Sequence, residues 1–134
     1  MKTTTIEQTI HFAASREEVY NALMNSAVHS EFTGATAVIG SKPGDTYSAY
    51  DGYIEGEILE LEPPHKIVKT WSAYEDGWPE GHWSKVTFTM TPEAEGTALH
   101  FLHEGVPAEM EETFRRGWED YYWNPMKAMF GSQD

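Results

Sequence analysis

The sequence predicts an α+β domain in which a curved antiparallel sheet grips one long C-terminal helix. Apolar and polar residues alternate along much of the chain between Thr3 and His103, and turn-forming residues divide this part into segments of strand length. Two short helical patterns follow the first strand, and the C-terminal segment carries aromatic residues at helical spacing. Such a helix has to cover the apolar face of the sheet, which often leaves a hollow between the two layers.

The first strand and two short helices open the chain. Alternation of apolar and polar residues predicts a strand from Thr3 to Phe12. Ser15 and Glu18 then have the spacing of a capping box, so a helix should begin there. The pair Asn25-Ser26 interrupts this helix before a second short helical piece at 27–32.

Turn residues divide the central part of the chain into antiparallel strands. Asp51-Gly52 is a tight hairpin signal, and Pro63-Pro64 closes the strand that follows it. The even-numbered residues from Val86 to Met90 are apolar and should face inward. We expect strands at 35–39, 46–50, 53–62, 67–73 and 85–90, and a last strand whose inward residues are Leu99, Phe101 and His103.

The final segment predicts the main helix, which opens after Pro107. Apolar residues recur at spacings of three, four and seven between Met110 and Phe130, and acidic residues precede them at the positive end of the helix dipole. Gly117 lowers helix propensity, so we expect it to permit close approach to the sheet. Pro125 cannot donate a backbone hydrogen bond, which predicts a kink or a break near Asn124.

Composition bounds the possible functions. A chain of 134 residues predicts a single domain spanning 1–134. The net charge of -13 disfavours binding to nucleic acid or to an anionic membrane surface. No cysteine is present, which excludes disulfides and thiolate metal sites. The N-terminus lacks an apolar signal core and no later stretch has the length of a membrane span, so we expect a cytoplasmic protein.

Five runs stand out in order along the chain: Phe32-Thr33-Gly34-Ala35, Asp51-Gly52-Tyr53-Ile54-Glu55-Gly56, Leu59-Glu60-Leu61-Glu62-Pro63 followed by Ile67-Val68-Lys69-Thr70-Trp71, Trp78-Pro79-Glu80-Gly81-His82, and Arg116-Gly117-Trp118-Glu119-Asp120-Tyr121-Tyr122. Together they resemble the AHSA-type domain, which is the C-terminal domain of the eukaryotic activator of the heat-shock chaperone ATPase and of its stand-alone homologues.

The resemblance spans essentially the whole chain and implies the helix-grip fold of the START-related (SRPBCC) superfamily, which includes lipid carriers, plant hormone receptors and polyketide cyclases. Ser72 follows Trp71 where that family commonly has an arginine. The eukaryotic activator also carries an N-terminal domain that grips the chaperone. This chain begins at its first strand, so we do not expect a chaperone stimulation that depends on that domain.

The sequence contains no pattern typical of a metal site, a nucleotide site or a serine nucleophile. No histidine pair has helical or strand ligand spacing, and there is neither a Gly-x-Ser-x-Gly elbow nor a phosphate-binding loop. We therefore expect no metal and no cofactor. The histidine best placed for chemistry is His103, which the alternation of the last strand points inward, where it could bind a ligand, act as a base or remain structural.

Aromatic residues gather at the end of the sheet and on the last helix, and two interpretations fit them. They can simply fill the core, or a subset can line an apolar pocket with a few polar anchors. The residues we assign to such a ligand cavity are Trp71, Phe88, Phe101, His103, Trp118, Tyr121 and Tyr122. In the loop after the fifth strand, Trp78, Pro79 and His82 either form a protein-contact surface or pack back onto the sheet.

Three functions follow from these patterns. The first is a non-catalytic domain that binds a hydrophobic small molecule between the sheet and the last helix. The second is a protein-interaction module of the chaperone-activator kind, which would use the loop at 78–83 and the acidic surface. The third is an enzyme of the cyclase or hydrolase kind that uses His103 as a base. The oligomeric state is not indicated.

Overall fold

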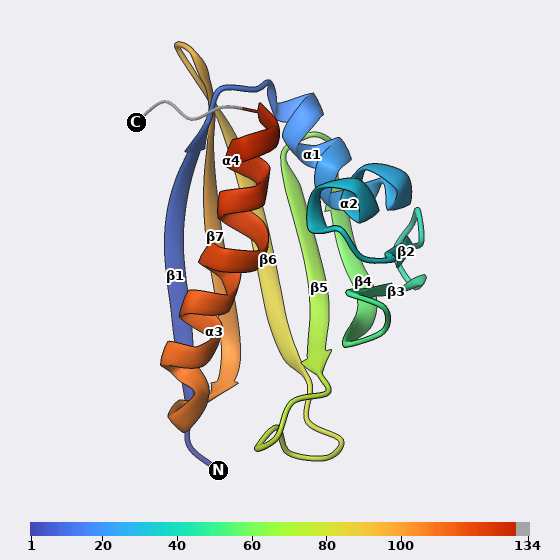
Figure 1. Ribbon diagram of the computed structural model, residues 1–134, viewed down its shortest axis with the longest axis vertical. Coiled ribbons are helices and arrows are strands. Elements are labelled where there is room, and N and C mark those ends of the chain that lie inside the picture. Colours follow the sequence, from blue (N-terminus) through green and yellow to red (C-terminus); the bar gives the residue numbers. More distant parts are fainter. Residues whose placement is uncertain (131–134) are drawn as a thin grey trace.

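The computed structural model describes residues 1–130, which form one antiparallel sheet with helices on one of its faces (Figure 1). The strands occur in the spatial order β1-β7-β6-β5-β4-β3-β2. Their bounds are β1 (Thr3–Phe12), β2 (Val38–Ile39), β3 (Thr46–Ala49), β4 (Ile54–Glu62), β5 (Lys66–Ala73), β6 (Ser84–Glu93) and β7 (Gly96–Pro107). The predicted α+β class and helix-grip plan are confirmed.

The helices form two groups on this face. The first group is α1 (Arg16–Met24) and α2 (Ser26–Thr33). The second group, here called the C-terminal helix, is continuous and consists of η1 (Ala108–Met110), α3 (Glu111–Trp118), the π-helical segment η2 (Glu119–Trp123) and α4 (Asn124–Phe130). Figure 1 shows it lying along β1, β7 and β6, while α1 and α2 lie beside its upper end and no helix covers the lower parts of β4 and β5.

Local sequence explains where the first two helices begin and end. The Ser15 hydroxyl accepts a hydrogen bond from the Glu18 amide at 3.1 Å, and the Glu18 carboxylate accepts one from the Ser15 amide at 3.1 Å, which is the predicted capping box. Asn25 caps α2 through the Val28 amide at 3.0 Å. The helix ends at Gly34, whose φ of 76° is the left-handed conformation that glycine adopts most easily.

Two irregular positions bend the sheet around the C-terminal helix. The pairing of β1 with β7 shifts register between Thr4 and Thr5, and the pairing of β4 with β5 shifts between Ile58 and Glu60. Such bulges increase the local twist and bend of a strand. The concave face carries the inward residues of β5, β6 and β7, which pack against Trp118 and Trp123 of the helix.

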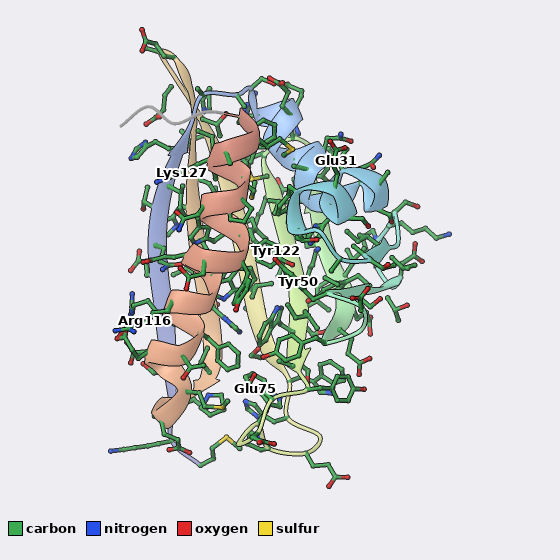
Figure 2. The ribbon with its side chains drawn as sticks, in the orientation of Figure 1. Glu31, Tyr50, Glu75, Arg116, Tyr122 and Lys127 are labelled. Atoms are coloured by element: carbon green, nitrogen blue, oxygen red, sulfur yellow. The ribbon has the colours of Figure 1, made fainter. Side chains whose placement is uncertain are left out.

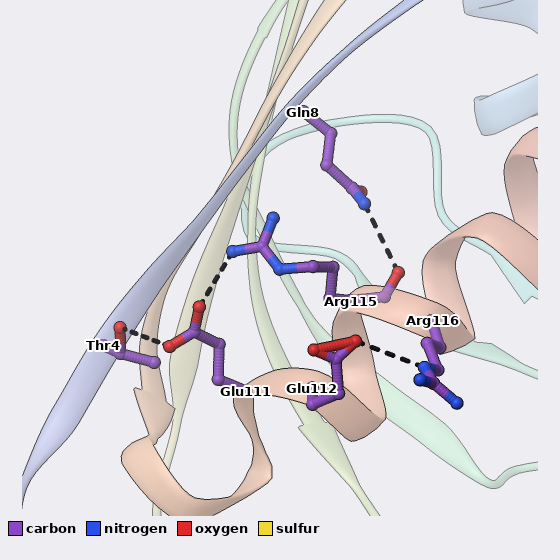
Figure 3. A network of polar contacts seen from close by, with 6 residues as sticks. All are labelled: Thr4, Gln8, Glu111, Glu112, Arg115 and Arg116. Carbon is purple, nitrogen blue, oxygen red and sulfur yellow. Dashed lines mark hydrogen bonds and ion pairs between the residues drawn. The ribbon is translucent and has the colours of Figure 1, made fainter.

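A network of polar contacts fixes the C-terminal helix to the β1 edge of the sheet (Figure 3). The Thr4 hydroxyl donates to the Glu111 carboxylate at 3.2 Å, and the same carboxylate pairs with Arg115 at 2.9 Å. The Gln8 amide donates to the Arg115 carbonyl at 3.3 Å and accepts from the Trp123 indole at 2.8 Å. The helix is thus held along β1, and its opposite side is turned toward β4 and β5.

The structure corrects three local expectations. Strand β2 comprises only 38–39 of the expected 35–39, because the Thr36 and Ala37 amides bond to the side chains of Asp51 and Ser30 at 2.9 Å each. Gly117 does not approach the sheet, since a Cβ placed there would meet no atom within 4 Å. Met129, one of the apolar residues whose spacing predicts the last helix, does not face the core and is 37% exposed.

At Pro125 the chain avoids a break by winding more loosely before it. The Asn124 amide bonds to the Glu119 carbonyl five residues back, as in a π-helix, and α4 continues from there. The expected irregularity is therefore present, but it takes the form of the π-helical segment η2 instead of a broken helix. None of the helices in residues 1–130 is long and apolar enough to cross a bilayer.

Candidate functional site

A cavity of about 650 Å³ lies between the C-terminal helix and the part of the sheet that no helix covers. Figure 2 shows Tyr122, Tyr50 and Glu75 following one another down the side of the helix that faces β4 and β5. The volume of the cavity falls within the usual range for small-molecule sites. Most of its wall is aromatic and comprises Tyr50, Tyr53, Trp71, Phe114, Trp118, Tyr121 and Tyr122.

The turn between β3 and β4 supplies one wall through an unusual backbone conformation. Tyr50 has a φ of 52° and Asp51 a φ of 58°, both in the left-handed region that non-glycine residues rarely adopt. In this conformation the Tyr50 hydroxyl donates to the Tyr121 carbonyl at 2.6 Å, and its ring lies 5.8 Å from that of Tyr121. Burial raises the pKa of Tyr50 to about 12. The strained turn is therefore tied directly to the helix across the cavity.

The π-helical segment supplies the opposite wall. In a π-turn, residues five apart lie one above the other, so Trp118 and Trp123 stack with centroids 5.6 Å apart and an interplanar angle of 19°. Tyr121 and Tyr122, the residues before Trp123, then both border the cavity. Tyr121 is 60% exposed, whereas Tyr122 is buried. Strained turns and π-segments both cluster at functional sites, and here they border the same space.

Polar groups are few in the wall of the cavity. The Tyr53 hydroxyl donates to the Glu75 carboxylate, and the pKa of Tyr53 is raised first by burial and then by this hydrogen bond. Asp120 and Arg116 lie on the helix side. The Arg116 guanidinium donates to Glu112 at 3.2 Å and its side chain is 75% exposed, so its charge is directed to the outer surface.

Of the seven residues assigned to the cavity from sequence, four border it: Trp71, Trp118, Tyr121 and Tyr122. Phe88, Phe101 and His103 do not, because Trp118 and Trp123 cover them directly. The centroids of Phe101 and Trp118 are only 4.5 Å apart, which leaves no room for a ligand between β7 and the helix.

His103 is a structural histidine in this arrangement. The Trp118 indole donates to His103 Nδ1 at 3.0 Å, which leaves Nε2 to donate to the Ser84 hydroxyl at 2.9 Å, and Ser84 donates to the Trp71 carbonyl at 2.8 Å. Burial lowers the pKa of His103 to about 3. Both ring nitrogens are occupied and the ring is fully buried, so in this arrangement neither nitrogen is free to accept a proton from a substrate.

A second buried polar group, which sequence reasoning missed, lies behind Tyr122. The Tyr122 hydroxyl donates to His29 Nε2 at 2.9 Å, and His29 Nδ1 donates to the Leu23 carbonyl at 3.3 Å. Burial, and secondly the nearby Lys69, lowers the pKa of His29 to about 4. His29 lies three residues before the apolar Phe32 in the second helix, so the helical period could have indicated that it faces inward.

Lys69 is another buried ionisable group that the sequence analysis overlooked. It lies on β5 between the inward residues Ile67 and Trp71, where strict alternation places it on the concave face. Its ammonium lies 4.3 Å from the centroid of the Tyr47 ring, and burial lowers its pKa to about 7. No carboxylate pairs with it among residues 1–130.

The loop between β5 and β6 packs back onto the sheet. The Trp78 indole donates to the His82 carbonyl at 2.9 Å, and its ring lies 5.5 Å from Trp71 and 5.6 Å from Phe114. The His82 ring donates to the Gly105 carbonyl at 2.7 Å. Trp78, Pro79 and His82 are each only partly exposed. The exposed aromatics near this loop are Trp83, which ends the segment at 78–83 assigned to protein contact, and Tyr74, which the sequence analysis did not select.

Potential metal ligands do not gather anywhere in the part of the chain that the structure describes: no group of three or more histidine and acidic side chains is suitably placed. The site is therefore a largely aromatic cavity with two carboxylates, Glu75 and Asp120, in its wall.

Comparison with known proteins places this fold in a family. Residues 13–131 match the family described as "Activator of Hsp90 ATPase homolog 1-like protein". The chain is 34% identical over 120 residues to the human activator of 90 kDa heat shock protein ATPase homolog 1. These aligned residues are 90% of this chain and 35% of that protein. It is 31% identical over 131 residues to an uncharacterised Schizosaccharomyces pombe protein, covering 98% of this chain and 38% of that protein.

Solved structures agree. An HSP90 activator from Plasmodium falciparum superposes with a TM-score of 0.84 at 25% identity, covering 96% of each chain. A Chromobacterium violaceum protein shares the fold with a TM-score of 0.78 at 22% identity, covering 96% of this chain and 98% of that one. This chain thus spans little more than a third of the two curated relatives and nearly the whole of the two solved structures. The chain belongs to the Activator of Hsp90 ATPase homolog 1-like family.

Proposed function

We propose that this chain is a non-catalytic binding domain whose cavity takes a small, largely apolar molecule. The observation that carries the proposal is the cavity of about 650 Å³ with seven aromatic residues in its wall. A cavity of this size with few polar groups is typical of a small-molecule site. Aromatic walls provide large apolar contact areas at little cost in side-chain entropy.

The hydrogen bonds around the cavity support binding over catalysis. The hydroxyls of Tyr50, Tyr53 and Tyr122 already donate to protein acceptors, namely the Tyr121 carbonyl, Glu75 and His29. They are therefore oriented by the fold and not poised to transfer a proton. A ligand would be held chiefly by contact with rings, which gives affinity without requiring a reaction.

Gly117 offers a direct test, because it borders the cavity and a Cβ there would meet no atom within 4 Å. The neutral fluorophore diphenylhexatriene should bind saturably, with energy transfer from the protein's tryptophans to the probe. Gly117→Leu should weaken this binding at least about tenfold, since its side chain would occupy the cavity, whereas removing a helical glycine costs no helix propensity.

The matched control is Gly117→Ala, which leaves most of the cavity open and should retain the affinity of the unchanged protein. Circular dichroism melting of both variants would show that each is folded. Absence of saturable binding to the unchanged chain by diphenylhexatriene and by other neutral apolar probes of similar size would contradict the proposal. Equal affinity of the Leu and Ala variants would place the probe elsewhere.

A second candidate function is contact with an Hsp90-type chaperone. The observation that favours it is the likeness to the Plasmodium falciparum HSP90 activator, which extends over 96% of this chain and 96% of that one. Trp83 and Tyr74, 52% and 69% exposed, flank the loop between β5 and β6. Exposed aromatic residues at one place are typical of protein-contact sites, and they supply the surface that Trp78 and His82 do not.

This candidate predicts that the chain binds a purified Hsp90-type chaperone and changes its ATPase rate, and that Trp83→Ser weakens binding about tenfold or more. The matched control is Leu59→Ser, at an apolar residue on β4 that is 43% exposed and away from the loop. If the unchanged chain neither binds the chaperone nor changes its ATPase rate, the candidate is excluded. An equal loss in both variants would show that the loop is not the contact.

A further inference from the structure

We propose that the cavity selects an organic cation, an amine or quaternary ammonium group on an apolar body, with the aromatic wall as a cage and Glu75 as the counter-charge. This rests on the proposed binding function and names the chemical class of the ligand. It follows from three features of the same space: the identity of its rings, the sign of its charged groups and the field of the whole chain.

The rings are of the kind that binds cations. Six of the seven aromatic residues in the wall are tryptophan or tyrosine, whose electron-rich faces attract ammonium groups more strongly than phenylalanine does. Three pairs of neighbouring rings stand at steep angles, 75° between Tyr50 and Tyr121, 69° between Tyr50 and Tyr122 and 83° between Trp71 and Phe114, whereas Trp118 is tilted by 42° from Trp71 and by 48° from Tyr122. Perpendicular rings present faces from several directions to one enclosed group, which is the geometry of cages that recognise quaternary ammonium ligands.

The charged groups of the wall also favour a cation. Glu75 accepts one hydrogen bond, from Tyr53, and its side chain makes no other hydrogen bond or ion pair among the described residues. A carboxylate accepts several hydrogen bonds, so it retains capacity for a ligand. Asp120 adds a second negative charge, and the only basic residue of the wall, Arg116, is already paired with Glu112.

The net charge of the whole chain also favours a cationic ligand over an anionic one. The chain carries a net charge of -13, which attracts cations toward the protein and raises their concentration near its surface. An anionic ligand such as a fatty acid would have to place its carboxylate beside Glu75 or compete with Glu112 for Arg116. Lys69 does not reverse this, because it lies outside the cavity wall, over the Tyr47 ring.

Three probes with the same apolar body test the proposal on the unchanged protein: diphenylhexatriene, its trimethylammonium derivative and its propionic acid derivative. The cationic probe should bind about tenfold more tightly than the neutral one, and the anionic probe more weakly than either. Glu75→Gln should remove most of the preference for the cation, so that its loss of affinity for the cationic probe is at least about fivefold larger than any change for the neutral one. Glutamine keeps an acceptor oxygen for the Tyr53 hydroxyl.

The control variant is Glu80→Gln, which removes the same charge from an exposed residue of the nearby loop that does not border the cavity. It should leave all three affinities unchanged. If the neutral probe binds as tightly as the cationic probe or more tightly, the cation selectivity is overturned but the binding function still holds. Equal losses in the two variants overturn the role of Glu75. Failure of all three probes to bind overturns the binding function itself, and the two proposals thus fail in distinguishable ways.

Discussion

Acidification from pH 6.5 to pH 4 should lower the free energy of unfolding by several kcal/mol, because the fold buries His29 and His103 in their neutral forms. Burial lowers the pKa of His29 to about 4 and that of His103 to about 3, against 6.5 for an unburied imidazole. Between these values the unfolded chain binds a proton at each position and the folded chain does not, so stability falls as pH falls. Each pKa unit corresponds to about 1.4 kcal/mol, which gives about 3 kcal/mol for each histidine at pH 4.

Urea unfolding at pH 7, 6, 5 and 4 measures this slope. Loss of negative charge as the pH approaches the pI of 4.7 acts in the opposite direction by relieving self-repulsion, so the histidines are isolated by comparing variants. His103→Gln should be less stable at pH 7, because Trp118 loses its acceptor, but its stability should fall less steeply with acid. His100→Gln, at a half-exposed histidine of the same strand, is the matched control. Parallel curves for all three proteins would contradict the assignment.

Replacing Lys69 with methionine should stabilise the protein by about 2–4 kcal/mol at pH 7 and below. The lysine is 4% exposed and its pKa is lowered from 10.5 to about 7 by burial, so the fold bears the cost of desolvating an ammonium group. Methionine has nearly the same length and no charge, although it gives up the contact of the ammonium with the Tyr47 ring.

The pH dependence of this gain distinguishes a charge effect from a packing effect. Between pH 7 and pH 10.5 the unfolded chain is protonated at Lys69 and the folded chain is increasingly neutral, so the original protein gains stability as pH rises. The advantage of Lys69→Met should therefore shrink from pH 7 to pH 10. Lys85→Met, at a half-exposed lysine on β6 that pairs with Glu104 at 3.7 Å, should change stability by less than about 1 kcal/mol. A gain that does not vary with pH would show that packing alone causes it.

The sequence was sufficient for most of the fold, because its signals are local. The limits of β1 and α1 follow from alternation and from the Ser15–Glu18 capping box, which act within a few residues. Expectations failed where contacts with residues distant in the sequence determine the local structure. The segment at 35–37 bonds to Ser30 and Asp51 instead of to a strand, and nothing in its own residues indicates those partners.

The cavity was only partly predictable for the same reason. Alternation shows that Trp71, Phe88 and Phe101 all face the helix, but not which of them the helix covers. That depends on the position of the helix across the sheet, which Thr4 and Gln8 fix from the opposite edge. Lys69 could have been found, since the alternation that selected Trp71 selects it equally.

The extra residue in η2 has a consequence for how members of such a family can differ. In η2 one turn contains five residues, whereas an α-helical turn closes with four. The extra residue rotates the segment after η2 by about 100° around the helix axis relative to the segment before it. A homologue one residue shorter at this point would keep Glu111 and Arg115 docked on β1 but rotate Met126 out of the interior. Insertions or deletions within 119–123 can thus change which side chains border the cavity while the contacts of the helix with β1 are kept.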